Sequence, residues 1–295
     1  MPNYRFTTVD VFTDQRFGGN PLAVFTDANG MADGEMQSLA TEFNLSETTF
    51  VLPPHDPTHT ARVRIFNRTH EMRFAGHPTV GTAFALARMA SGHAEIFEFE
   101  VLAGLVAVRI ERDADGILRG ATIDAPQPLL LGPQISPELI AGCIGLDTSD
   151  IIVAAHPPVE ASVGNTYVIT EVSETALSRA VPDVSAFRRL LERSPALNGR
   201  FSLYLYSRDG NAIDARMFAP LVGTFEDPAT GSAATPLAAL LLSLSINESE
   251  DFVVRQGVHM GRPSLMRVTA HSAQDGIRAS VGGTCIPVLQ GEAML

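Results

Sequence analysis

The feature that most constrains this chain is an internal repeat. Residues 76–83 read GHPTVGTA, and residues 226–233 read EDPATGSA. Both segments fit the pattern [His/Asp]-Pro-x-x-Gly-[Ser/Thr]-Ala, and the first positions of the pattern, His77 and Asp227, are 150 residues apart. Similarity at a fixed spacing is the usual signature of a duplicated structural unit.

Two further matches occur in the same order at nearly the same spacing. An Arg-x-Phe triplet precedes each motif, at Arg64 and Arg216, and a Gly-Asn pair lies at 19–20 and again at 164–165. Short Gly, Ala and Pro patterns also recur by chance, but three matched segments in one order favour duplication of a unit of about 150 residues. Two copies do not make a solenoid, so we expect two lobes that face each other.

The coarse pattern predicts many short strands and few helices. Strand-like runs cover residues 5–12, 22–25, 61–66, 94–101, 105–110, 167–170, 201–206, 212–218, 265–270 and 276–281. Helical patterns cover 33–42, with Met36, Leu39 and Ala40 on one face, 136–142 and 184–192.

Two more predicted helices follow the repeated motifs, at 78–90 and 228–244. Each starts with Pro, which suits a first helical turn, and each is apolar on nearly every side, which is typical of a buried helix. Pro236 should kink or break the second one.

We therefore predict an α+β fold with two pseudo-symmetric lobes, each a curled, mostly antiparallel sheet around a central buried helix. The N-terminal lobe covers residues 1–122 and the C-terminal lobe 123–280, and the tail 281–295 could return to the first lobe.

Composition argues against several classes of protein. The chain has 295 residues, 45% of them apolar, and a formal net charge of −12. An acidic surface repels phosphate backbones, so nucleic acid is not an expected partner. The longest strongly apolar run, 237–246, is too short to cross a bilayer, so we expect no membrane association. The two cysteines, Cys143 and Cys285, are far apart in sequence, which fits a reducing compartment, and we expect the cytoplasm.

Cofactor motifs are missing from the sequence. There is neither a G-x-G-x-x-G segment after a strand nor a lysine phosphate loop, and His70, Glu71 and His77 lack a standard zinc spacing. A racemase that uses two thiols would need one cysteine in each of the repeated motifs, and neither cysteine lies in them. A mechanism of that kind is therefore excluded. We expect no metal and no other cofactor.

The two helix starts are the strongest candidates for a site. The first N–H groups of a helix lack internal partners and carry partial positive charge, and glycines there let a ligand approach the backbone, so a carboxylate or an enolate would fit. The glycines could instead serve only helix packing. A lone His77 could be structural and a lone Asp227 a helix cap, but their equivalence in the repeat predicts that both point into one cleft.

Two other polar residues, Glu47 and Arg262, can each be interpreted in two ways. Glu47 is flanked by Leu45 and Phe50, which would partly desolvate the carboxyl group and raise its pKa toward the range of a general base. It could equally be a surface residue in a turn. Arg262 could pair a carboxylate or form a structural salt bridge.

The order of several segments resembles that of the PhzF-like proteins of phenazine biosynthesis. The matching segments are VDVF at 9–12, GGNPLAV at 18–24, NLSET at 44–48, GHPT at 76–79, GN at 164–165, EDPATGSA at 226–233, QG at 256–257 and MGRPS at 260–264. The resemblance covers essentially the whole chain. It implies a diaminopimelate-epimerase-like fold, a homodimer, and isomerisation of 2,3-dihydro-3-hydroxyanthranilate without a cofactor.

The resemblance also implies roles for individual residues. The catalytic Glu of the family falls on Glu47, its partner His on His77 and its Asp on Asp227. Gly76 and Ser232 fall on positions that help to hold the substrate. The substrate-binding candidates are Gly76 and Ser232 together with Asn20, Ser46 and Gly231.

The leading hypothesis is a cofactor-independent isomerase that shifts a proton within a small, cyclic amino or hydroxy carboxylic acid, with Glu47 as general acid and base. One alternative is a racemase or epimerase that uses Glu, His and Asp in place of thiols. The other is a ligand-binding homologue without turnover, against which the intact set of three acid–base residues argues.

Overall fold

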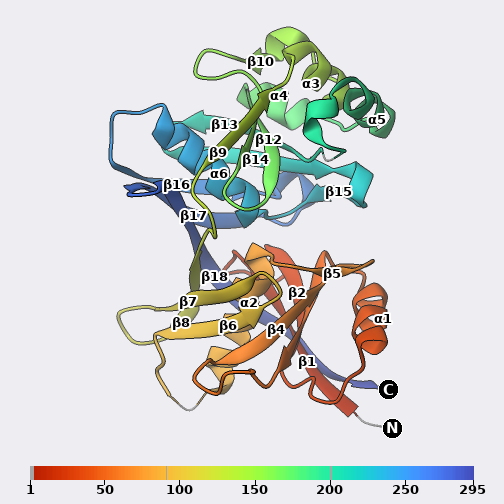
Figure 1. Ribbon diagram of the computed structural model, residues 1–295, viewed down its shortest axis with the longest axis vertical. Helices are drawn as coiled ribbons and strands as arrows, with labels where there is room; N and C mark the ends of the chain where they lie inside the picture. Colours follow the sequence, from red (N-terminus) through yellow and green to blue (C-terminus); the bar gives the residue numbers. More distant parts are fainter. Residues whose placement is uncertain (1–2, 91, 200) are drawn as a thin grey trace. The chain divides into compact units, whose positions relative to one another are not determined.

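The computed structural model describes residues 3–90, 92–199 and 201–295 (Figure 1). The chain divides into two compact units, one formed by Met1–Asp124 with Gly282–Leu295 and the other by Ala125–Val281. The predicted lobes also include residues 1, 2, 91 and 200, which lie outside the described residues. Across the described residues, no helix is long and apolar enough to span a membrane.

The first unit is a sheet that closes around one helix. Its elements are β1 (Asn3–Val11), β2 (Asn20–Phe25), α1 (Asp33–Phe43), β3 (Glu47–Leu52), β4 (Ala61–Phe66), β5 (Glu71–Met72), α2 (Gly76–Met89), β6 (Ile96–Val101), β7 (Gly104–Arg112), β8 (Leu118–Asp124) and the later part of β18 (Gly276–Met294). Neighbouring strands pair in the order β1, β2, β3, β4, β6, β7, β8, β18 and back to β1. The sheet is therefore a closed barrel.

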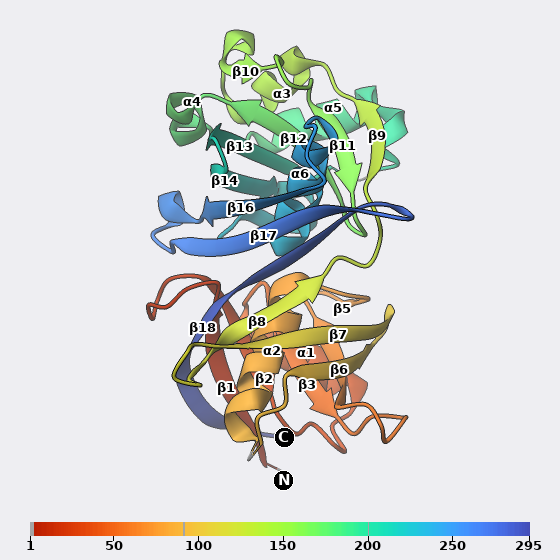
Figure 2. The same ribbon diagram turned by 90° about the vertical axis from the view of Figure 1, so that its left-hand side faces the viewer.

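Helix α2 fills this barrel because nearly all of its surface is apolar. Eleven of its fourteen residues are buried, and it packs on β1, β2, β7 and β8 (Figure 2). A helix without a polar face has no favourable position at the surface, so closing the sheet around it removes most of the helix from water.

The second unit carries the other half of the elements. These are β9 (Leu130–Gln134), α3 (Pro137–Ile144), β10 (Ile151–Ile152), β11 (Val159–Ser162), β12 (Thr166–Val172), α4 (Glu174–Arg179), α5 (Val184–Arg193), β13 (Leu203–Asp209), β14 (Ala212–Ala219), β15 (Thr224–Asp227), α6 (Gly231–Ser243), β16 (Ser249–Gln256), β17 (Ser264–Ala273) and the start of β18, with short 3₁₀ turns at Thr148–Asp150, Pro195–Leu197, Pro220–Val222 and Val258–Met260. Helix α6 packs on β11, β12, β16 and β17.

The strand pairings follow the same order in both units. In the first unit β1–β2, β3–β4 and β6–β7 are antiparallel, whereas β2–β3 and β4–β6 are parallel. In the second unit β11–β12, β13–β14 and β16–β17 are antiparallel, whereas β12–β13 and β14–β16 are parallel. The overall content is mixed α and β, with parallel pairs at matching places in each copy.

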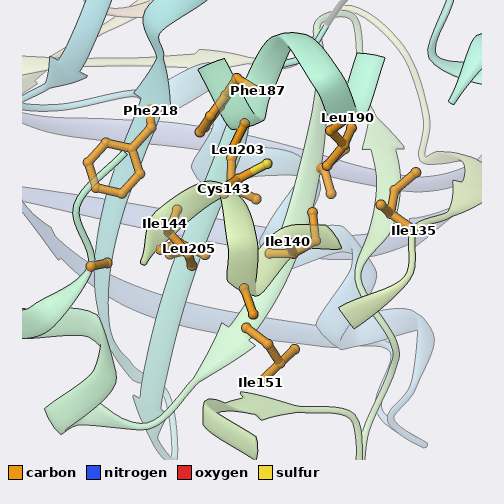
Figure 3. Close-up of a cluster of buried hydrophobic side chains, with 14 of the residues drawn as sticks. Ile135, Ile140, Cys143, Ile144, Ile151, Phe187, Leu190, Leu203, Leu205 and Phe218 are labelled. Carbon is orange, nitrogen blue, oxygen red and sulfur yellow. The ribbon is translucent and has the colours of Figure 1, made fainter. Parts of the chain in front are cut away.

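Each unit also has a hydrophobic cluster on the outer side of its sheet. In the second unit α3 and α5 supply Ile140, Cys143 and Phe187, which pack with Leu203 and other strand residues (Figure 3). Burial raises the pKa of Cys143 to about 12, so this thiol stays protonated and is a core residue. In the first unit the prediction that Met36, Leu39 and Ala40 form the buried face of a helix is confirmed in α1.

One prediction about a proline needs correction. Helix α6 begins at Gly231, so Pro228 precedes the helix and does not belong to its first turn. Of the kink or break predicted at Pro236, the break does not occur, since α6 continues through that residue. A proline inside a helix removes one hydrogen bond, here to the carbonyl four residues earlier, Ser232. That residue lies in the first turn, and burial of the whole apolar helix outweighs the loss.

Several elements were not predicted from the sequence. They include β8, β9, β11, β15, β16 and the short helix α4. From Asp251 to Gln256, strand β16 alternates between exposed and buried residues, and charged residues occupy two of the four exposed positions of the strand.

Candidate active site

In the first unit an acidic side chain lies beside an imidazole. Glu47 begins β3, next to Ser46, and His77 is the second residue of α2. The Glu47 Oε2 and His77 Nε2 atoms are 3.3 Å apart, and the two side chains are only 15% and 7% exposed. The start of strand β3 and the start of the buried helix therefore place a carboxyl group and an imidazole in direct contact.

The environment of His77 fixes its protonation. The Nδ2 atom of Asn20 lies 3.4 Å from His77 Nδ1, and with the amide in this orientation Nδ1 accepts and the ring hydrogen is on Nε2. Burial lowers the pKa of His77 to about 3, so the ring is neutral near pH 7. The buried Nε2 makes no hydrogen bond of good geometry with the described residues, and it is therefore a donor that a bound molecule could use.

In the second unit a carboxylate is held by a buried polar network. Asp227 ends β15 and is 7% exposed. Its Oδ2 accepts a 2.6 Å hydrogen bond from Thr230 Oγ1. Gln256, fully buried at the end of β16, donates from Nε2 to the Asp227 carbonyl at 2.8 Å and to Thr230 Oγ1 at 2.9 Å. Asp227 is thus fixed through both its backbone and its side chain.

Two tyrosines lie close to this network. The Tyr204 hydroxyl donates to Gln256 Oε1 at 3.1 Å, and the Tyr167 hydroxyl is 2.7 Å from Ser232 Oγ. Burial raises the pKa of Tyr204 well above its usual range, and the nearby Tyr167 and Asp227 add to this effect. Tyr204 is therefore a permanent hydrogen-bond donor.

The two long buried helices begin without a side-chain cap. The N-cap residue of α2 is Ala75, which has no polar side chain. The N-cap residue of α6 is Thr230, whose hydroxyl donates to Asp227 and makes no bond to the helix backbone. An uncapped helix start keeps its partial positive charge and can attract an anion.

The structure brings some of the predicted residues together within each unit. Asn20, Glu47 and His77 are neighbours in the first unit, where Gly76 begins α2. Asp227 lies in the second unit, where Gly231 and Ser232 begin α6. No group of three or more His, Cys, Asp or Glu side chains within the described ranges could hold a metal ion.

Four polar residues near Asp227 were not predicted as site residues: Tyr167, Tyr204, Thr230 and Gln256. Thr230 and Gln256 do lie in segments that carry the family resemblance, so the signal was available for these two. For Arg262, the structure shows that its backbone carbonyl accepts a 3.3 Å bond from Ser264 Oγ.

A barrel closed around a buried helix, with a carboxyl group and an imidazole in contact at the helix start, defines a class of scaffold suited to proton transfer. The chain belongs to the phenazine biosynthesis-like protein family, whose model matches residues 9–291. The resemblance inferred from the sequence motifs is confirmed.

Curated relatives and solved structures match over the full length. An uncharacterized isomerase of Mesorhizobium japonicum is 37% identical over 306 residues, with all of both chains covered. The trans-2,3-dihydro-3-hydroxyanthranilate isomerase of Pseudomonas aeruginosa is 36% identical over 296 residues, covering 99% of this chain and 100% of that protein. A Bacillus anthracis phenazine biosynthesis protein of the PhzF family aligns with a TM-score of 0.88 at 26% identity, with both chains fully covered.

Proposed function

We propose that this protein is an isomerase that moves a proton within a small cyclic amino or hydroxy carboxylic acid, with Glu47 as general acid and base. The observation that carries the proposal is the Glu47 carboxyl group in contact with a buried, neutral His77. The relatives support the reaction type, since those with full-length matches are named isomerases, and one of them is named for an amino-hydroxy ring acid.

The chemistry needs one proton carrier and one group that steadies negative charge. The Glu47 carboxylate removes a proton from a substrate carbon next to a double bond. The C–H electron pair forms a new double bond to the neighbouring carbon, and the π electrons of the old double bond form the new C–H bond at the far carbon with the proton that Glu47 returns. Electrons and atoms balance within the substrate, so we propose that the reaction requires no cofactor. The neutral His77 N–H is suited to donate a hydrogen bond to the developing anion, as in an oxyanion hole.

The proposal assigns the second unit a role in the same reaction. Asp227 is a candidate for proton exchange or for holding the substrate's polar groups, and the α6 start at Gly231 and Ser232 for binding a carboxylate. Asn20, Ser46 and Gly76 are the binding candidates of the first unit. A pseudo-symmetric two-lobe arrangement, a homodimer and a cytoplasmic location are parts of the same proposal. Light scattering would test the dimer by a particle mass twice the chain mass of 31.5 kDa.

The test is a comparison of Glu47→Gln with the wild type, using trans-2,3-dihydro-3-hydroxyanthranilate as first substrate and related cyclic acids as a panel. Loss of a general acid–base residue should lower kcat by about 10²–10⁴-fold while ligand binding changes little. Glu42→Gln, on the exposed side of α1, is the matched control and should keep full activity. Turnover by Glu47→Gln at the wild-type rate would remove Glu47 from the mechanism.

Turnover in D₂O separates the candidate reactions. Deuterium at a new ring carbon, with a shifted double bond, supports isomerisation. Deuterium at a stereocentre with inversion would instead favour a racemase or epimerase. Saturable binding of the acids without turnover in the wild type would point to a ligand-binding homologue.

A further inference from the structure

The strongest unexplained feature is the polar network around Gln256. Gln256 is fully buried, yet all four of its hydrogen-bonding positions are occupied. Its Nε2 donates to the Asp227 carbonyl at 2.8 Å and to Thr230 Oγ1 at 2.9 Å. Its Oε1 accepts from the Thr230 backbone N–H at 3.2 Å and from the Tyr204 hydroxyl at 3.1 Å. A side-chain amide has two donors and two acceptor sites, so none is left over.

Two backbone groups determine the orientation of the Gln256 side-chain amide. The Asp227 carbonyl can only accept, so it requires the Nε2 end of Gln256. The Thr230 backbone N–H can only donate, so it requires the Oε1 end. Because both constraints agree, the direction of every bond in the network follows from the backbone.

The direction of the next bond then follows. Gln256 donates to Thr230 Oγ1, so the single hydroxyl hydrogen of Thr230 must point elsewhere. It points to Asp227 Oδ2, 2.6 Å away. The Oδ2 atom therefore has to accept, and it cannot carry a proton of its own while the network is intact.

We propose that Gln256 is a positioning residue that acts through Thr230 to keep Asp227 Oδ2 a hydrogen-bond acceptor, so that any proton exchanged by Asp227 is carried on its other oxygen. This inference rests on the proposed function for the role of Asp227 in the reaction. The network itself is a property of the second unit.

The internal repeat shows that the network is not a general requirement of the fold. Val80 takes the motif position of Thr230 in the first copy, and β6, the strand that corresponds to β16, ends in Val101 where β16 ends in Gln256; neither valine can form such bonds. In the first unit His77 is held by Asn20 instead. The network thus occurs in the copy that has a carboxylate at the start of the motif, which is where a donor to that carboxylate is useful.

A matched pair of variants at Thr230 tests the proposal. Thr230→Val removes the hydroxyl at nearly constant shape, and Thr230→Ser keeps it. A hydrogen bond to the charged form of a carboxyl group favours ionisation. In Thr230→Val the NMR titration midpoint of the Asp227 side-chain carboxyl should therefore rise by about one pH unit. It should stay at the wild-type value in Thr230→Ser. The Asp227→Asn spectrum assigns the signal.

Gln256→Glu gives a second, independent test. The carboxylate at position 256 can still accept from Tyr204 and from the Thr230 N–H, but it cannot donate to Thr230 Oγ1. The Thr230 hydroxyl then turns toward residue 256, and the added negative charge also disfavours ionisation of Asp227, so the Asp227 titration should move upward by more than in Thr230→Val. A network that is only structural would lower stability in Thr230→Val without moving the titration. An unchanged midpoint in both Thr230→Val and Gln256→Glu would overturn the proposal.

The activity readout distinguishes this proposal from the proposed function. In an active enzyme the acid limb of the kcat–pH profile should shift with the Asp227 midpoint in Thr230→Val and stay in place in Thr230→Ser. A shifted midpoint with an unmoved kcat profile would overturn the positioning role while leaving the isomerase intact. If the wild type showed no turnover with the panel while the midpoint still shifted, the proposed function would fail and the hydrogen-bond assignment would stand.

Discussion

Acidification should destabilise the protein through one histidine. Burial lowers the pKa of His77 from 6.5 to about 3. Between these two values the unfolded chain binds a proton that the folded chain does not, so the free energy of unfolding falls as the pH falls. The contribution of the neutral His77 to the free energy of unfolding is complete above pH 6.5 and is lost progressively as the pH falls toward 3. From pH 7 to pH 5 the loss from this residue is about 2 kcal/mol.

Urea unfolding of the wild type and of His77→Asn at pH 7, 6 and 5 measures this loss. Other titrating groups contribute equally to both proteins, so the difference between the two pH dependences isolates His77. We expect the wild type to lose about 2 kcal/mol more than the variant over this range. An imidazole NMR signal for His77 should stay at its neutral position down to pH 5.

A competing effect gives the result that would refute this reasoning. A Glu47 carboxylate 3.3 Å from Nε2 favours the charged imidazole. If that attraction exceeded the desolvation cost, His77 would titrate near or above pH 6.5, and the two proteins would lose stability in parallel on acidification. The neutral N–H donor assigned to His77 in the proposed mechanism would then be wrong as well.

Two pairs of variants provide their own controls. One pair compares equivalent arginines in the two copies of the repeat, and the other compares two glycines with similar φ angles. Arg216→Met should lower the free energy of unfolding by about 3–5 kcal/mol, because it leaves the Glu226 carboxylate, 12% exposed, without its bidentate partner. Arg64→Met, at the equivalent but more exposed position, should cost less, and equal losses in chemical denaturation would contradict the argument from burial. Gly261→Ala should cost about 1–2 kcal/mol for its φ of 69° alone. Gly257→Ala has a similar φ of 75° but would bring its Cβ within 2.4 and 2.6 Å of two carbonyl oxygens, so it should cost clearly more in the same measurement.

The sequence was most informative where one local pattern decides the structure. The strand at Ala61–Phe66 has the predicted bounds, and the buried face of α1 follows from its helical period. The two helices that are apolar on every side had to be buried, wherever the sheet lay. In each case the pattern and the burial it predicts lie within a few residues of each other.

The polar networks could not be predicted in the same way. Gln256 lies 26 residues from Thr230 and 52 from Tyr204, and its bonds depend on the register of β16 beside β14. From the sequence, Thr230 would be interpreted as an ordinary helix cap. The structure shows that its hydroxyl instead donates to Asp227. Similarly, resemblance suggested roles for Glu47 and His77, but their contact depends on how β3 and α2 meet.

The two helix starts show how a duplicated backbone can acquire different chemistry. In one copy the motif begins with a neutral imidazole, oriented by a donor on Asn20, whose remaining N–H can only donate. In the other it begins with a carboxylate whose Oδ2 accepts from Thr230. A donor in one copy and an acceptor in the other make the two starts chemically distinct. The repeated motif therefore fixes where a polar group stands at each helix start, and the residue type at positions 77 and 227 decides whether that group donates or accepts.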